Sequence, residues 1–277
     1  MKAVFVVTAL AAALFPAAGR SAVDEPQVLI RPSTKTQVSL WYRGLPARVP
    51  RQVDLDAIRD AGFTAVTWPL QHVDGALELR RMAGRARLQV VIRSEPVALT
   101  AASALQKSTH VDILIPQTPL RLLPVLMWRA VAHGARVVSF DAGLTQGTGL
   151  RDDAGNTPSW VAPVTAVAHQ LFLNRTMVDM LTTEPGVEVE PALPRLDVAL
   201  LDAGRSWVLI ATNVSEPGVP PADAYAFLPH HVPPAEWLNL FDGSTIGMLR
   251  QPSAVRWHVV LGPGDVRLYA ISKIEKD

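Results

Sequence analysis

The chain has no cysteine among its 277 residues. This absence excludes disulfide bonds, thiolate nucleophiles and cysteine-bound zinc, so the fold must be stabilised by the burial of apolar side chains. Charge is also scarce, because charged residues make up 18% of the chain and the formal net charge is +1. A chain with this charge balance has no overall excess of positive charge that would attract nucleic acid or an anionic membrane surface. We therefore expect no nucleic-acid partner.

Long apolar runs without charge are missing after the first residues of the chain. The opening run, residues 3–15, follows Lys2 and precedes the small residues 17–19. It is too short to cross a hydrocarbon core, which takes about 20 helical residues. The alternative of a buried first helix lacks a polar face at helical spacing. This pattern predicts a signal peptide over residues 1–22 and a secreted or periplasmic protein with no membrane span after its removal.

Short β-rich apolar runs alternate with helical stretches between residues 37 and 183. The expected strands are 38–41, 64–68, 88–92, 111–115 and 136–140, and the expected helices are 54–61, 76–83, 100–106, 120–133 and 160–181. Such alternation is typical of α/β folds with parallel strands. We expect a (β/α) barrel-like domain of about five βα units, which is incomplete beside a full barrel of about 250 residues. An open doubly wound sheet is the alternative, although no glycine-rich phosphate loop follows the first strand.

The pattern changes after the segment Glu184, Pro185 and Gly186 to short strands separated by turn dipeptides. We expect strands at 196–201, 207–213, 224–227, 237–240, 254–261 and 265–271. Alternating residues with glycine-containing turns favour antiparallel pairing. Residues 187–277 are therefore predicted to form a small antiparallel β-sandwich.

Two carboxylates directly follow predicted strands. Glu95 comes after strand 88–92, and Asp141 comes after strand 136–140. Hydrolysis of a glycosidic bond needs one carboxylic acid to protonate the leaving oxygen and one carboxylate to attack or to activate water. Glu95 and Asp141 are our candidate catalytic pair, and the sequence leaves open which acts as acid. The alternatives are a solvated loop acid for Glu95 and a turn-ordering role for Asp141.

Aromatic and polar residues near strand ends are candidates for contact with a carbohydrate. Sugars stack their apolar faces on aromatic rings, while arginine and histidine donate hydrogen bonds to hydroxyls. The candidate substrate-binding residues are Trp41, Tyr42, Arg43, Trp68, His72, Arg93 and Trp160. Core packing is the alternative for the large aromatics. No G-x-S-x-G elbow occurs and the seven histidines are dispersed, so we expect neither a serine nucleophile nor a metal or other cofactor.

Two segments resemble a known family. Residues 57–68 resemble the first helix and second strand of barrel glycoside hydrolases, and residues 127–140 resemble the late helix and strand of the β-galactosidase-like clan. Short runs near Asn213, Asp242 and Asp265 are similar to the β domain that closes many glycosidases. The resemblance implies a carbohydrate substrate and an acid after strand four. Here Gln117 follows that strand, whereas the Ser-Glu-Pro motif at Glu95 follows the third strand.

The sequence thus leads to two hypotheses. The first is an exported glycoside hydrolase-like protein that acts on a glycan or oligosaccharide by carboxylate acid/base catalysis. The second is a non-catalytic carbohydrate-binding or envelope structural protein built on a degenerate barrel.

Overall fold

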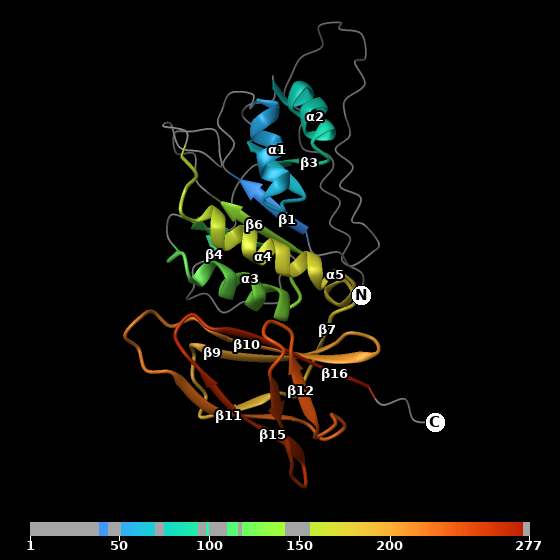
Figure 1. Ribbon diagram of the computed structural model, residues 1–277, viewed down its shortest axis with the longest axis vertical. Helices are drawn as coiled ribbons and strands as arrows, with labels where there is room; N and C mark the ends of the chain where they lie inside the picture. Colours follow the sequence, from blue (N-terminus) through green and yellow to red (C-terminus); the bar gives the residue numbers. More distant parts are fainter. Residues whose placement is uncertain are drawn as a thin grey trace, which may run out of the picture. The chain divides into compact units, whose positions relative to one another are not determined.

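The computed structural model describes residues 39–43, 51–69, 75–93, 98–99, 110–115, 118–141 and 156–273 (Figure 1). The predicted signal peptide, residues 1–22, lies outside the described residues. All described residues belong to one compact unit. Within these ranges, no helix combines the length and the apolar character that a membrane crossing requires.

The first part of the chain forms a parallel sheet, as the βα alternation predicts. Its strands are β1 (Ser39–Arg43), β2 (Ala65–Pro69), β3 (Gln89–Arg93), β4 (Ala98–Leu99), β5 (His110–Leu114) and β6 (Val137–Asp141). Each expected strand is present with ends shifted by at most two residues. The two-residue strand β4 was not predicted, because two residues are too few to show a period.

The strand order is β3-β2-β1-β6-β5-β4, and every neighbouring pair is parallel. A doubly wound sheet of six strands has the order 3-2-1-4-5-6 instead. Pairing of β1 with β6 gives the four inner strands the neighbours that they would have around a barrel. Within the described ranges the sheet ends at β3 and β4, which are not paired with each other.

Helices cover one face of this sheet (Figure 1). They are α1 (Gln52–Asp60), α2 (Ala76–Arg85), α3 (Leu122–Ala132), α4 (Val161–Leu173) and α5 (Arg175–Val178). Val66, Val138 and Phe140 of the sheet share a hydrophobic core with buried residues of the helices. The single helix expected at 160–181 is divided at Asn174, whose backbone N–H and side-chain Nδ2 both donate to the Gln170 carbonyl, at 3.1 and 2.9 Å.

Three of the helices end in a left-handed residue just before a strand. Gly62, Arg87 and Gly134 have φ angles of 93°, 59° and 90°. After α2, the N–H of Leu88 donates to the Ala83 carbonyl at 2.8 Å, which is the bond of a Schellman ending. These endings stop each helix and turn the chain directly into the next strand.

The second part of the chain contains two antiparallel sheets, as predicted. The six-stranded sheet has the order β13 (Thr245–Gly247), β12 (Glu236–Asn239), β16 (Val266–Ser272), β10 (Ser206–Asn213), β9 (Leu196–Asp202) and β7 (Thr182–Glu184). The four-stranded sheet has the order β14 (Leu249–Arg250), β15 (Ala254–Leu261), β11 (Ala222–Pro229) and β8 (Glu188–Glu190). Our first domain was predicted to end at residue 183, within β7, which pairs with β9 of the sandwich.

The pattern of buried and exposed residues along a strand shows which faces of its sheet are packed against other parts of the protein. β11 and β15 alternate between buried and more exposed residues, because only the inner face of the four-stranded sheet packs in the sandwich core. β9 and β10 are buried almost throughout. On their second face, Leu201 and Ile210 share a core with Trp128 of α3. The antiparallel six-stranded sheet is therefore covered on both faces at β9 and β10.

Candidate functional site

The carboxyl ends of the parallel strands bring together residues that are distant in sequence. In the register, Arg43 of β1 pairs with Thr67 of β2 on one side and with Asp141 of β6 on the other. Asp141 also pairs with Leu114 of β5. Ligand sites of parallel α/β folds lie at this edge of the sheet. The pairing places Asp141, the last residue of β6, in the middle of that edge.

Asp141 is nearly buried, with 8% of its surface exposed. Aspartate is rarely buried to this extent, since a desolvated carboxylate needs polar or charged partners. The predicted position at a strand end is confirmed, and the burial is a property that the sequence did not reveal. A carboxylate in such a place can act on a ligand in a medium where charge is poorly screened.

Two buried hydroxyls lie on the same face of the sheet as Asp141. Thr67 is 3% exposed and Ser139 is fully buried, and neither hydroxyl has a hydrogen-bond partner among the described residues. A buried polar group without a partner costs about 1–3 kcal/mol, so such a group calls for an explanation such as a ligand or an ordered water. Sequence analysis missed both residues, because a single Ser or Thr within a β-rich run is ordinary in a strand.

Paired positions in a parallel sheet share a face, and alternate residues of a strand belong to opposite faces. For Trp41, Tyr42, Arg43, Trp68 and Arg93, the strand pairings are what the structure describes. Trp41 pairs with Ser139, Arg43 with Asp141, and Arg93 with Pro69, two residues beyond Thr67. These three positions therefore belong to the face of Asp141.

Tyr42 and Trp68 are each one residue along the strand from a position on the face of Asp141, so their positions belong to the opposite face. Tyr42 pairs with Val66 and Phe140, which lie in the core beneath the helices. Trp68 lies two residues beyond Val66 on the same strand, so its position belongs to the helix-covered face. The register thus brings the predicted residues to one edge of the sheet but divides them between its faces.

The other predicted residues are not part of the described edge. Glu95 and His72 lie outside the described residues. Trp160, immediately before α4, is 8% exposed and belongs to the hydrophobic core around α3 and α4. Its burial favours a packing role over the ligand contact that we expected. Among the residues that the structure describes, no group of three or more histidines and carboxylates is placed to hold a metal ion.

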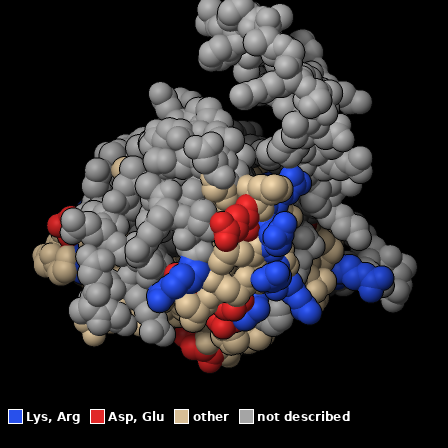
Figure 2. Space-filling view, turned by 90° about the horizontal axis from the view of Figure 1, so that it is seen from above, with Lys and Arg blue, Asp and Glu red and all other residues tan. Residues whose placement is uncertain are grey.

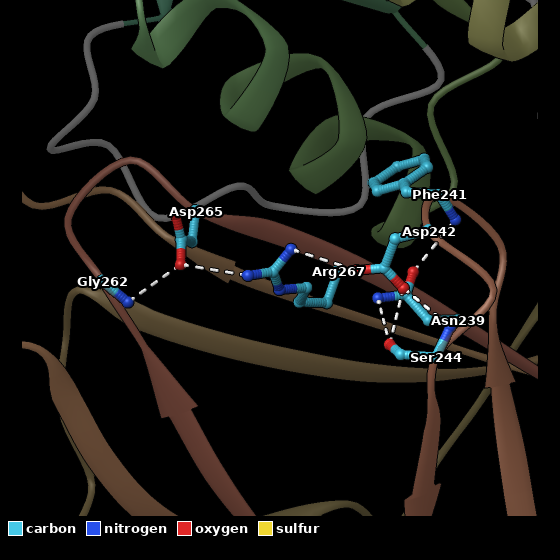
Figure 3. Close-up of polar contacts among 7 residues, drawn as sticks. All are labelled: Asn239, Phe241, Asp242, Ser244, Gly262, Asp265 and Arg267. Carbon is cyan, nitrogen blue, oxygen red and sulfur yellow. Dashed lines mark hydrogen bonds and ion pairs between the residues drawn. The ribbon is translucent and has the colours of Figure 1, made fainter.

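A second polar cluster, in the β-sandwich, has a different character (Figure 3). Asp242 accepts hydrogen bonds from the N–H and the hydroxyl of Ser244 at 2.9 and 2.5 Å, and the pKa of Asp242 is lowered by these bonds. The guanidinium of Arg267 lies 4.0 Å from the Asp242 carboxylate and 3.7 Å from that of Asp265. Asp265 also accepts the N–H of Gly262 at 3.1 Å.

This cluster joins the turn after β12 to the turn after β15. Its carboxylates already accept hydrogen bonds from their own turns, whereas the hydroxyls of Thr67 and Ser139 lack described partners. Satisfied turn networks stabilise loops, and unsatisfied buried groups are more often associated with function. The edge around Asp141 is therefore the stronger candidate site.

Comparison with known proteins supports the fold. No protein-family model matches the sequence, and no curated protein matches it. A noncanonic maltogenic alpha-amylase from Thermotoga neapolitana is similar in structure at 7% identity and a TM-score of 0.55, over 85% of this chain and 99% of that chain. An alpha-amylase from Geobacillus thermoleovorans, complexed with acarbose, has 6% identity and a TM-score of 0.51 over 87% and 99%. At such identities the likeness shows only that the chain shares the fold of these two amylases.

Proposed function

We propose that the protein is an exported glycoside hydrolase-like enzyme that acts on a glycan or oligosaccharide by carboxylate acid/base catalysis without a cofactor. The observation that carries the proposal is Asp141, a nearly buried carboxylate at the carboxyl end of β6. The parallel sheet, with the strand order of an opened barrel, is interpreted as an incomplete (β/α) barrel over residues 37–183. The β-sandwich follows over residues 187–277.

Asp141 and Glu95 are proposed to fill the two catalytic roles. One carboxyl group protonates the leaving oxygen of the scissile bond, and the other attacks the sugar or activates water. Thr67 and Ser139 lie on the face of Asp141, and their hydroxyls have no partner among the described residues, which suits them to hydrogen bonding with substrate hydroxyls or with an ordered water. The positions of Arg43 and Arg93 belong to the same face, and both residues are proposed as further contacts for the substrate.

Activity of the purified protein on aryl glycosides and polysaccharides tests this assignment. Asp141→Asn and Glu95→Gln should each lower kcat by about a hundredfold or more, the usual contribution of general acid/base catalysis. Glu216→Gln is the matched control, because Glu216 is an exposed carboxylate in a loop of the β-sandwich. Equal activity of the wild-type protein and both site variants would exclude the pair.

Export rests on the predicted signal peptide over residues 1–22. Fractionation of cells that express the full chain should recover the protein outside the cytoplasm, and its first residue should lie close to residue 23. Recovery in the cytoplasm with Met1 or Lys2 at the amino terminus would contradict export.

The alternative function is carbohydrate binding without catalysis. It is favoured by the number of described parallel strands, six against the eight of a complete barrel. In that case one of the tested polysaccharides should bind to the protein, as measured by calorimetry, and should not be hydrolysed. Asp141→Asn should then weaken binding, while Glu216→Gln should not.

A further inference from the structure

Helix α2 carries a basic face that plays no part in the candidate site. Arg80, Arg81, Arg85 and Arg87, within α2 and just after it, are all exposed, and Leu77 on the same side is 72% exposed. The opposite side of the helix, formed by Leu79, Ala83 and Ala86, is fully buried. We refer to the four arginines together with Leu77 as the α2 face. Figure 2, viewed from the end at which Figure 1 shows α1 and α2, has several Lys and Arg side chains on the described surface, with Asp and Glu side chains between them.

The arginines at the neighbouring helix α1 form ion pairs with nearby carboxylates. Arg51 forms an ion pair with Asp54 at 3.3 Å, and Arg59 forms one with Asp60 at 2.7 Å. No arginine of the α2 face forms an ion pair with any of the described residues. Arg81 and Arg85 are also four residues apart on the helix, a spacing at which like charges repel. The exposed Glu78 lies on the same side of α2, so the α2 face keeps a net excess of positive charge that forms no ion pair with the described residues.

The carboxyl-terminal part of the α2 face, with Arg85 and Arg87, is separated from the edge that carries Asp141. Arg87 precedes β3 by two residues, so the last turn of α2 lies at the amino-terminal start of that strand. Asp141 lies at the carboxyl end of the parallel sheet. A ligand held by these arginines would therefore occupy a second position on the protein.

We propose that the α2 face binds an anionic polysaccharide whose sugars carry carboxylate groups. Exposed guanidinium groups match carboxylates in charge and in the geometry of paired N–H donors. Leu77 provides an apolar contact for the CH face of a sugar ring. A membrane surface is a poorer match, because an interfacial helix needs a broad apolar face, and α2 exposes one large apolar residue. The choice of a glycan rests on the proposed function.

Binding of polygalacturonate by the purified protein tests the proposal, with neutral amylose as the comparison polymer. The double variant Arg81→Ala/Arg85→Ala should bind polygalacturonate about tenfold more weakly at low salt, since two charge contacts are lost. Arg81→Lys/Arg85→Lys keeps the charge but loses the paired N–H donors, so its affinity should fall between those of the wild-type protein and the alanine variant. The matched control Arg205→Ala/Arg250→Ala removes two exposed arginines from the β-sandwich and should bind like the wild-type protein.

Several results would overturn the proposal. The proposal is wrong if the wild-type protein does not bind polygalacturonate, or binds DNA or anionic vesicles more tightly. It is also wrong if the β-sandwich control or the lysine variant loses as much affinity for polygalacturonate as Arg81→Ala/Arg85→Ala. Hydrolysis of a neutral aryl glycoside is measured separately on the same variants. That activity depends on Asp141 and should be unchanged by substitutions in α2, so a failure of the hydrolase proposal is distinguishable from a failure of this one.

Discussion

Gly62, at the end of α1, lies directly against Ala168 of α4. A Cβ atom added at position 62 would stand 2.4 Å from the Ala168 Cβ, which is far inside van der Waals contact. Gly62 also has a φ of 93°, in the left-handed region that residues with a side chain rarely adopt. The close approach of the two helices therefore depends on the absence of a side chain at this position.

Gly62→Ala should destabilise the protein by at least about 2 kcal/mol, because left-handed strain and overpacking against Ala168 add together. Urea denaturation of the variant and the wild-type protein measures the difference. Gly84→Ala is the matched control. Gly84 lies inside α2 with open space around its missing Cβ, so this change should stabilise the helix by up to about 1 kcal/mol. Equal stability of Gly62→Ala and the wild-type protein would contradict the helix contact.

Arg87 occupies, after α2, the place that glycine holds after α1 and α3. Its φ of 59° costs about 1 kcal/mol in a residue with a side chain, and part of this cost is offset by the greater freedom of glycine in the unfolded chain. Arg87→Gly should therefore raise the stability by roughly 0.5 kcal/mol. Arg87→Ala removes the same exposed charge without relieving the backbone. A gain from alanine as large as that from glycine would show that charge, and not backbone conformation, is responsible.

The buried hydroxyls of Thr67 and Ser139 predict a conflict between stability and function. Thr67→Val and Ser139→Ala each remove a buried polar atom that has no partner among the described residues, and each should stabilise the protein by about 1 kcal/mol. The same changes should weaken glycan turnover or binding if these hydroxyls contact the ligand. Thr212→Val is the control, because Thr212 of β10 also has a buried hydroxyl without a described partner but lies in the β-sandwich. A gain in stability without a loss of function at positions 67 and 139 would remove both from the site.

The lowered pKa of Asp242 predicts a dependence of stability on pH. The hydrogen bonds from Ser244, with a smaller contribution from Arg267, hold this pKa below its ordinary value of 3.8. A folded-state pKa below the unfolded one stabilises the protein above pH 3.8, and this stabilisation is lost as the pH falls through the folded pKa. Asp242→Asn should therefore lose less stability than the wild-type protein on acidification. Urea midpoints measured down to about pH 2.5 test this, and parallel curves for the two proteins would contradict it.

Much of the local structure follows from the sequence. Gly62 and Gly134 mark helix ends in the amino-acid pattern, and the alternation along β11 and β15 matches the burial that the structure shows. These features depend on near neighbours in the chain. β7 and β8 were missed, because each has only three residues and is defined by pairing with a distant strand.

The sequence by itself determined the α/β and antiparallel regions, and it placed Asp141 at the end of a strand, because helix and strand periods and turn residues are local properties. Only the tertiary structure decided which residues meet. Register set Arg43 beside Asp141 and put Tyr42 on the other face, since a shift of one residue reverses the face. Packing buried Trp160, and it buried Thr67 and Ser139 without a hydrogen-bond partner in the part of the chain that the structure describes. Helix packing likewise gathered the α2 arginines on one exposed side, which a net charge of +1 conceals.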